Sequence, residues 1–136
     1  MGKILAIDYG NKRTGLAVTD DLQLIASALD TVLTADLWPY LNAYFEKYQV
    51  DIAVIGEPKD LMGNPTDASK KVEEFVVAFS RKYPTIVIAR MDERFTSKLA
   101  VQTMVQGGMK KKERRKKGNV DRIAATLMLQ DYLNFR

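Results

Sequence analysis

The sequence predicts an α/β protein in which a five-stranded mixed sheet carries helices on both faces. Short apolar runs alternate with longer segments whose apolar residues recur at helical spacing, in the order β-β-β-α-β-α-β-α-α. Three strands in succession predict an antiparallel portion, and strands that alternate with helices predict a parallel portion. The expected strand order is therefore 3-2-1-4-5, with right-handed crossovers that place helices on both faces.

The N-terminal segment predicts a β-hairpin. An apolar run over residues 3–7 ends at Asp8, and a glycine-containing turn separates it from a second run over residues 16–18. Asp8 would stand at the carboxyl end of the first strand, where α/β proteins build their sites. The alternative is that Asp8 only begins a turn, because Asp-x-Gly is common turn chemistry. This segment alone does not separate the two interpretations.

The remaining elements follow from spacing, glycine, proline and capping residues. A third strand is expected within residues 24–32, and a helix from about residue 35 to residue 48. We then expect a strand over 51–55 stopped by Gly56-Glu57-Pro58, a helix capped by Thr66 or Asp67 and ended by Pro84, a strand over 85–89, a helix that runs to Gly107-Gly108, and a last helix capped by Asn119.

Length and composition indicate one globular domain. The chain has 136 residues, of which 46% are hydrophobic, so a single domain over residues 1–136 with a substantial core is expected. No apolar run approaches the length of a membrane span, and the N-terminus has no signal-peptide layout. We therefore expect a cytoplasmic protein without membrane contact.

Two absent residue types narrow the chemistry. The sequence contains no cysteine and no histidine. Thiol catalysis, disulfides, the Ser-His-Asp triad and zinc sites built from these residues are thereby excluded. Carboxylates that hold Mg²⁺ or Mn²⁺ fit the remaining side chains best.

The positive charge is concentrated in one segment. Residues 110–117 hold seven cations and one anion, a net charge of +6, in a chain whose total charge is +4. Such a local patch predicts contact with a polyanion, and the alternative is a solvated loop. Its basic residues are Lys110, Lys111, Lys112, Arg114, Arg115, Lys116 and Lys117.

Carboxylates stand at the predicted ends of the parallel strands. Asp8, Glu57 and Asp92-Glu93 end the first, fourth and fifth strands, and the last helix can bring Asp121 to the same edge. Converging carboxylates repel one another unless a cation lies between them. Two Mg²⁺ ions about 4 Å apart can activate water and stabilise the leaving oxygen of a phosphodiester. The alternative is that each acid is an ordinary strand-exit, loop or helix-start residue.

Three motifs together resemble the YqgF family: residues 7–15, 92–97 and 120–125, with Gly56 and Pro58 between them. The resemblance covers almost the whole chain. Members are described as nucleases of precursor 16S ribosomal RNA, and earlier as Holliday junction resolvases. The resemblance implies an RNase H-like fold and a metal-dependent endonuclease that processes the 5' end of pre-16S rRNA in ribosome biogenesis.

The resemblance also implies roles for individual residues. Asp8, Glu93 and Asp121 match the family's catalytic, metal-binding acids, with Mg²⁺ or Mn²⁺ as cofactor. Arg13 and Arg94 suit bidentate contact with phosphate, although Arg94 can equally pair with a neighbouring acid. Glu57 departs from the family pattern, in which an apolar residue is common, so it can assist or replace Glu93.

Alternative functions remain at this point. The turn Asp8-x-Gly10 with Gly15 also resembles the phosphate hairpin of the actin and sugar-kinase superfamily, but those proteins need two such domains. A second alternative is a resolvase of branched DNA, and a third is an RNA-binding assembly factor without catalysis. A homodimer would suit a symmetric junction, and a monomer would suit trimming of a single strand.

Overall fold

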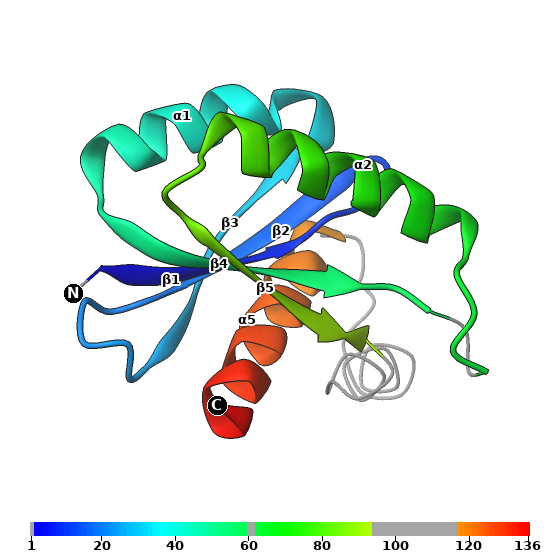
Figure 1. The fold of residues 1–136 in the computed structure, drawn as a ribbon. Helices are drawn as coiled ribbons and strands as arrows, with labels where there is room; N and C mark the ends of the chain where they lie inside the picture. Colours follow the sequence, from blue (N-terminus) through cyan, green and yellow to red (C-terminus); the bar gives the residue numbers. More distant parts are fainter. Residues whose placement is uncertain (1, 60–61, 94–116) are drawn as a thin grey trace.

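One mixed sheet organises the part of the chain that the computed structural model describes: residues 2–59, 62–93 and 117–136, with backbone alone for 117–121. The strand order is β3-β2-β1-β4-β5 (Figure 1). The β1–β2 and β2–β3 pairs are antiparallel, and the β1–β4 and β4–β5 pairs are parallel. This confirms the predicted sheet. The strands are β1 (Lys3–Asp8), β2 (Arg13–Thr19), β3 (Ala26–Leu33), β4 (Val50–Glu57) and β5 (Val87–Asp92).

Helices cover both faces of the sheet, as predicted. Helices α1 (Leu37–Lys47) and α2 (Asp67–Lys82) lie side by side on one face, and α5 (Lys117–Phe135) lies on the other (Figure 1). A 3-10 turn, Thr34–Asp36, leads into α1. The helix expected to end at Gly107-Gly108 lies outside the described residues.

Alternate side chains of the strands fill a hydrophobic core on each face. Leu5 and Ile7 of β1 pack with α1 and α2 on what we call the α1–α2 face. Ile4 and Ala6 pack with α5 on the α5 face. Because both faces are covered, the central strands are continuous apolar runs. The pleat thereby assigns each residue of a strand to one of the two faces.

The end of β4 differs from the sequence prediction. The strand does not stop before Gly56 but includes Gly56 and Glu57, because these residues pair with Met91 and Asp92 of β5. The tertiary pairing outweighs the local tendency of glycine to interrupt a strand. The carboxyl ends of β4 and β5 therefore lie level with each other.

Other boundaries shift by a few residues. Helix α5 already begins at Lys117, so Asn119 lies inside it and is not its cap, contrary to prediction. Helix α1 begins at Leu37 rather than residue 35, because the 3-10 turn occupies the preceding residues. The third strand begins at Ala26, and the fifth at Val87.

The start of α2 is held by a capping box. The Thr66 side chain accepts a hydrogen bond from the Ser69 backbone N–H at 3.2 Å, and Ser69 Oγ accepts one from the Thr66 N–H at 2.9 Å. Ser69 Oγ also donates to the carbonyl of Pro58, just after β4. Thr66 is therefore the cap, which was one of the two predicted residues. The bond to Pro58 also attaches the start of α2 to the end of β4.

Removal of this cap should cost stability. We expect Thr66→Ala to lower the free energy of unfolding by about 1 kcal/mol, because the Ser69 N–H loses its side-chain acceptor and keeps only the Thr66 carbonyl at 3.0 Å. Thr85→Ala, at an exposed turn position, is the matched control and should change it by less than about 0.5 kcal/mol. Urea unfolding followed by circular dichroism measures both values; equal losses would contradict a capping role.

Candidate active site

The three parallel strands end at one edge of the sheet. Ile7 of β1 pairs with Ile55 of β4, and Glu57 at the end of β4 pairs with Asp92 at the end of β5. Asp8 follows Ile7 as the last residue of β1. The acids that the sequence places at these strand ends therefore share the carboxyl edge.

The pleat divides these acids between the two faces. Asp8 lies two residues after Ala6, so it belongs to the α5 face, where it is only 8% exposed. Glu57 lies two residues after Ile55, so it belongs to the α1–α2 face, and Asp92 shares that face as its cross-strand partner. Glu57 and Asp92 are thus separated from Asp8 by the sheet.

Glu93 reaches the face of Asp8 by lying over Gly56. A Cβ atom built on Gly56 would lie 2.6 Å from Oε1 of Glu93 and 3.2 Å from Sδ of Met128 in α5. Gly56 follows Ile55 as Asp8 follows Ile7, so it is next to Asp8 across the β1–β4 pair. The Glu93 carboxylate therefore lies at the same edge and on the same face as Asp8.

Helix α5 runs antiparallel to β1. The Arg136 guanidinium donates to the side-chain and backbone oxygens of Gln23 at 3.0 and 2.8 Å, and the Gln23 amide donates to the Gly2 carbonyl at 2.8 Å. The C-terminal end of α5 thus lies beside the start of β1. Its N-terminal part, which contains Asp121, is directed toward the carboxyl edge (Figure 1). The side chain of Asp121 is outside the described set.

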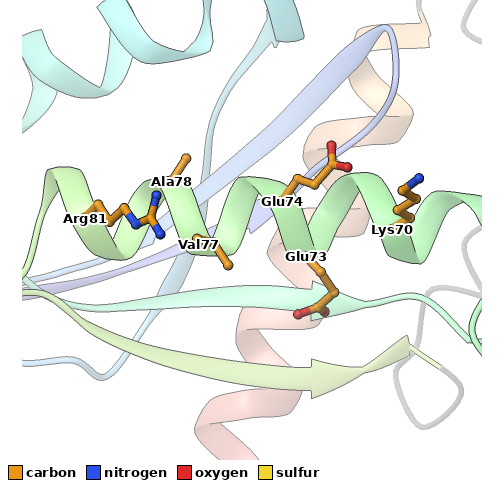
Figure 2. Close-up of a pocket in the computed structure, with 6 residues that line it drawn as sticks. All are labelled: Lys70, Glu73, Glu74, Val77, Ala78 and Arg81. Atoms are coloured by element: carbon orange, nitrogen blue, oxygen red, sulfur yellow. The ribbon is translucent and has the colours of Figure 1, made fainter.

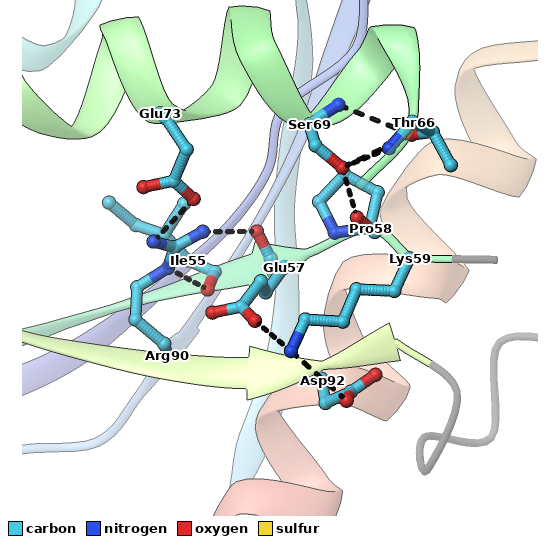
Figure 3. A network of polar contacts seen from close by, with 10 residues as sticks. Ile55, Glu57, Pro58, Lys59, Thr66, Ser69, Glu73, Arg90 and Asp92 are labelled. Carbon is cyan, nitrogen blue, oxygen red and sulfur yellow. Dashed lines mark hydrogen bonds and ion pairs between the residues drawn. The ribbon is translucent and has the colours of Figure 1, made fainter. Parts of the chain in front are cut away.

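The second group of acids is engaged in ion pairs on the α1–α2 face. Figure 3 shows Lys59 Nζ, which lies 2.6 Å from Oε1 of Glu57 and 3.8 Å from Oδ2 of Asp92. Lys59 follows the end of β4, so this contact joins the ends of β4 and β5. The arrangement favours a structural role for Glu57 over a place beside Asp8.

Arg90 reinforces the same region. Its guanidinium donates to the carbonyls of Ile55 and Gly56, both at 3.2 Å, and lies 2.8 Å from Oε1 of Glu73 in α2 (Figure 3). One side chain of β5 therefore holds the end of β4 and fastens α2 to it. Neither Lys59 nor Arg90 carries a sequence motif that would have predicted this contact.

The turn between β1 and β2 is braced from three sides. The Tyr9 ring stacks on Phe75 of α2 with centroids 4.6 Å apart. The Gly10 carbonyl accepts a hydrogen bond from Thr34 Oγ1 at 2.6 Å, and Asn11 Oδ1 accepts one from Lys71 Nζ at 2.6 Å. A Cβ on Gly10 would lie 2.1 Å from the carbonyl oxygen that follows three residues later, so only glycine fits this turn.

Arg13 begins β2 on the α5 face. Its position follows from the register, because Gly15 pairs with Asp8 and Arg13 lies two residues before Gly15. Arg13 is therefore on the face of Asp8, at the carboxyl edge. The other predicted phosphate contacts, Arg94 and the basic residues 110–116, lie outside the described residues, and Lys117 is the first residue of α5.

The donor set suits a hard divalent cation. Asp8 and Glu93 present carboxylates at one edge and on one face, and carboxylate oxygens are the ligands that Mg²⁺ and Mn²⁺ prefer. No group of three metal-ligating side chains occurs within the part of the chain whose side chains are described. Asp121, the predicted third acid, falls outside that part. The two acids thus fit two ligands of the predicted site.

An open groove in the described part of the chain lies elsewhere. Its volume is about 530 Å³, and Figure 2 shows that all its lining residues come from α2. It contains no residue from a strand end, so we do not place the active site there. Its lining is Lys70, Glu73, Glu74, Val77, Ala78 and Arg81.

None of the helices in the described ranges has both the length and the apolar character needed to cross a membrane.

Known proteins resemble this chain over nearly its full length. Residues 2–135 match the family described as "RuvX: Holliday junction resolvase". Proteins named "Putative pre-16S rRNA nuclease" are 51% identical in Flavobacterium psychrophilum, over 98% of this chain and 97% of that protein, and 47% identical in Parabacteroides distasonis, over 98% and 95%.

One solved structure is less similar. YeaZ from Pseudomonas aeruginosa is 15% identical with a TM-score of 0.47, over 79% of this chain and 50% of that chain. This likeness is too distant to bear on the site.

Proposed function

The chain belongs to the RuvX family, and on this premise we propose that it is a nuclease whose substrate is precursor 16S ribosomal RNA. The family description and the names of its relatives support hydrolysis of phosphodiester bonds in nucleic acid. The observation that carries the proposal is the placement of Asp8 and Glu93 at one edge and on one face of the sheet. One sheet covered on both faces supports a single nuclease domain over residues 1–136.

In this proposal Asp8, Glu93 and Asp121 hold Mg²⁺ or Mn²⁺. The ion, when bound, activates water and stabilises the leaving oxygen of the phosphodiester. Asp8, at the end of the central strand β1, would be the central ligand, and Glu93 and Asp121 would complete the set. Arg13 and Arg94 hold the phosphate group through bidentate hydrogen bonds.

Cleavage assays distinguish this function from its alternatives. Labelled pre-16S RNA and a four-way DNA junction are incubated side by side with Mg²⁺, and we expect cleavage of the RNA. Cleavage of the junction alone would instead support the resolvase activity in the family description, for which a homodimer is suitable. Binding of RNA without cleavage of either substrate would indicate a non-catalytic assembly factor.

The basic segment 110–117 should govern affinity. Each cation that binds a phosphate releases counterions, so binding should weaken steeply as salt rises. Replacement of its seven cations by alanine should flatten the salt slope by up to about one unit for each phosphate that is no longer neutralised. Salt titrations of RNA binding by the wild type and this variant measure the slopes; superimposable slopes would identify the segment as a solvated loop.

A further inference from the structure

Gly56 occupies a place in β4 where a side chain would collide with Glu93. The Cβ of any other residue would lie 2.6 Å from Oε1 of Glu93 and 3.2 Å from Sδ of Met128. The first distance is well inside van der Waals contact, and the second is tight. The space beside the Gly56 backbone is therefore already filled, on one side by a carboxylate and on the other by a side chain of α5.

Backbone conformation does not explain this glycine. Among the described residues, Gly63 is the one glycine with a positive φ, at 86°. Gly56 lies in regular strand pairing with Met91, a setting that other residues adopt readily. Glycine weakens a strand interior, and its presence there often marks a close approach by another group. At this position the approaching group is Glu93.

We propose that Gly56 is a positioning residue: the space left by its missing side chain receives the Glu93 carboxylate and holds it next to Asp8. This inference rests on the proposed function, in which Glu93 is a metal ligand. Two further contacts border this space. The Gly56 carbonyl accepts a hydrogen bond from Arg90 at 3.2 Å, and Met128 belongs to the buried core of the α5 face.

A methyl group at position 56 therefore displaces the Glu93 carboxylate while both acids remain in the chain. We expect Gly56→Ala to lower kcat by about 10²-fold, the effect of a misplacement of about 1 Å. The KM for RNA should change little, because the phosphate contacts are made elsewhere. Calorimetry with Mn²⁺ alone should show binding weakened by about 10–100-fold, the range for residues that orient metal ligands.

A double-mutant cycle with Glu93→Asp tests the mechanism. Aspartate is one methylene shorter, so its carboxylate does not extend over position 56. Gly56→Ala should then lower kcat and Mn²⁺ affinity little in the Glu93→Asp background, although it lowers both strongly in the wild type. Such non-additivity is expected when the two residues act through the same contact; additive losses would overturn the proposal.

Two further variants exclude a merely structural effect. Val54→Ala, earlier on the same face of β4, removes buried volume without adding an atom near Glu93, and should lower the melting temperature while preserving kcat and Mn²⁺ affinity. Met128→Ala combined with Gly56→Ala should not restore activity. Restoration by Met128→Ala would show that contact with α5, rather than with Glu93, is responsible, and would overturn the proposal.

The outcomes for this inference and for the proposed function are distinguishable. A fully active Glu93→Gln variant would contradict the metal site itself. An inactive Glu93→Gln variant together with a Gly56→Ala variant of wild-type activity and Mn²⁺ affinity would contradict the positioning role alone.

Discussion

Asp8→Asn is expected to abolish cleavage of pre-16S RNA and leave the fold intact. Asp8 lies at the end of β1, next to Gly56 and on the face where Glu93 lies. The substitution removes the negative charge that a divalent cation needs but changes the side-chain volume little. We expect the rate to fall by at least about 10²–10³-fold, as for loss of a preorganised electrostatic group.

Single-turnover cleavage with Mg²⁺, together with circular dichroism and thermal unfolding, measures this effect. Asp21→Asn is the matched control, because Asp21 is an exposed acid in the β2–β3 turn that pairs with Lys3 at 3.3 Å, at the opposite end of the sheet. The control should cleave at the wild-type rate. Wild-type activity of Asp8→Asn would overturn the assignment of Asp8 as a metal ligand.

The sheet order could be predicted from the sequence because it depends on a pattern that is local. Each strand is a short apolar run, and the lengths of the connections decide which pairs are antiparallel and which are parallel. The ends of strands depend on distant partners, and local residue types describe them less well. β4 continues through Gly56 and Glu57 because β5 is there to pair with them.

The sequence also predicted the edge of the sheet on which the acids gather, but not their faces. Asp8 and Glu57 each end a parallel strand, so they share an edge. Their opposite faces follow from the register, in which Asp8 and Gly56 are the neighbours. A shift of the strand pairing by one residue moves every side chain of that strand to the opposite face. A single sequence does not reveal this register.

Contacts between distant residues were the least predictable part. Lys59 pairs with Glu57 near it in sequence, but its approach to Asp92 and the contacts of Arg90 with β4 require the folded sheet. The sequence contained one signal for the close approach at Glu93. Gly56 directly follows an apolar strand run, and its pairing with Met91 places it inside β4, where a glycine often marks a neighbouring group that comes close.

Glu93→Gln and Glu57→Gln form a matched pair that tests the separation of the two acids. Both changes replace a carboxylate by an amide of similar shape near the carboxyl edge. Glu93 lies over Gly56 on the α5 face with Asp8, whereas Glu57 lies on the other face and pairs with Lys59 at 2.6 Å. We therefore expect Glu93→Gln to lose cleavage by about 10²-fold or more.

Glu57→Gln is expected to retain most of the activity. Its side chain is 29% exposed, and loss of a partly exposed ion pair costs less than about 1 kcal/mol of stability. Cleavage rates and calorimetric titration with Mn²⁺ are measured for both variants. Reduced cleavage and Mn²⁺ affinity in Glu57→Gln, with wild-type values in Glu93→Gln, would show that the metal ligand comes from β4, so that the α5 face would not be the catalytic one.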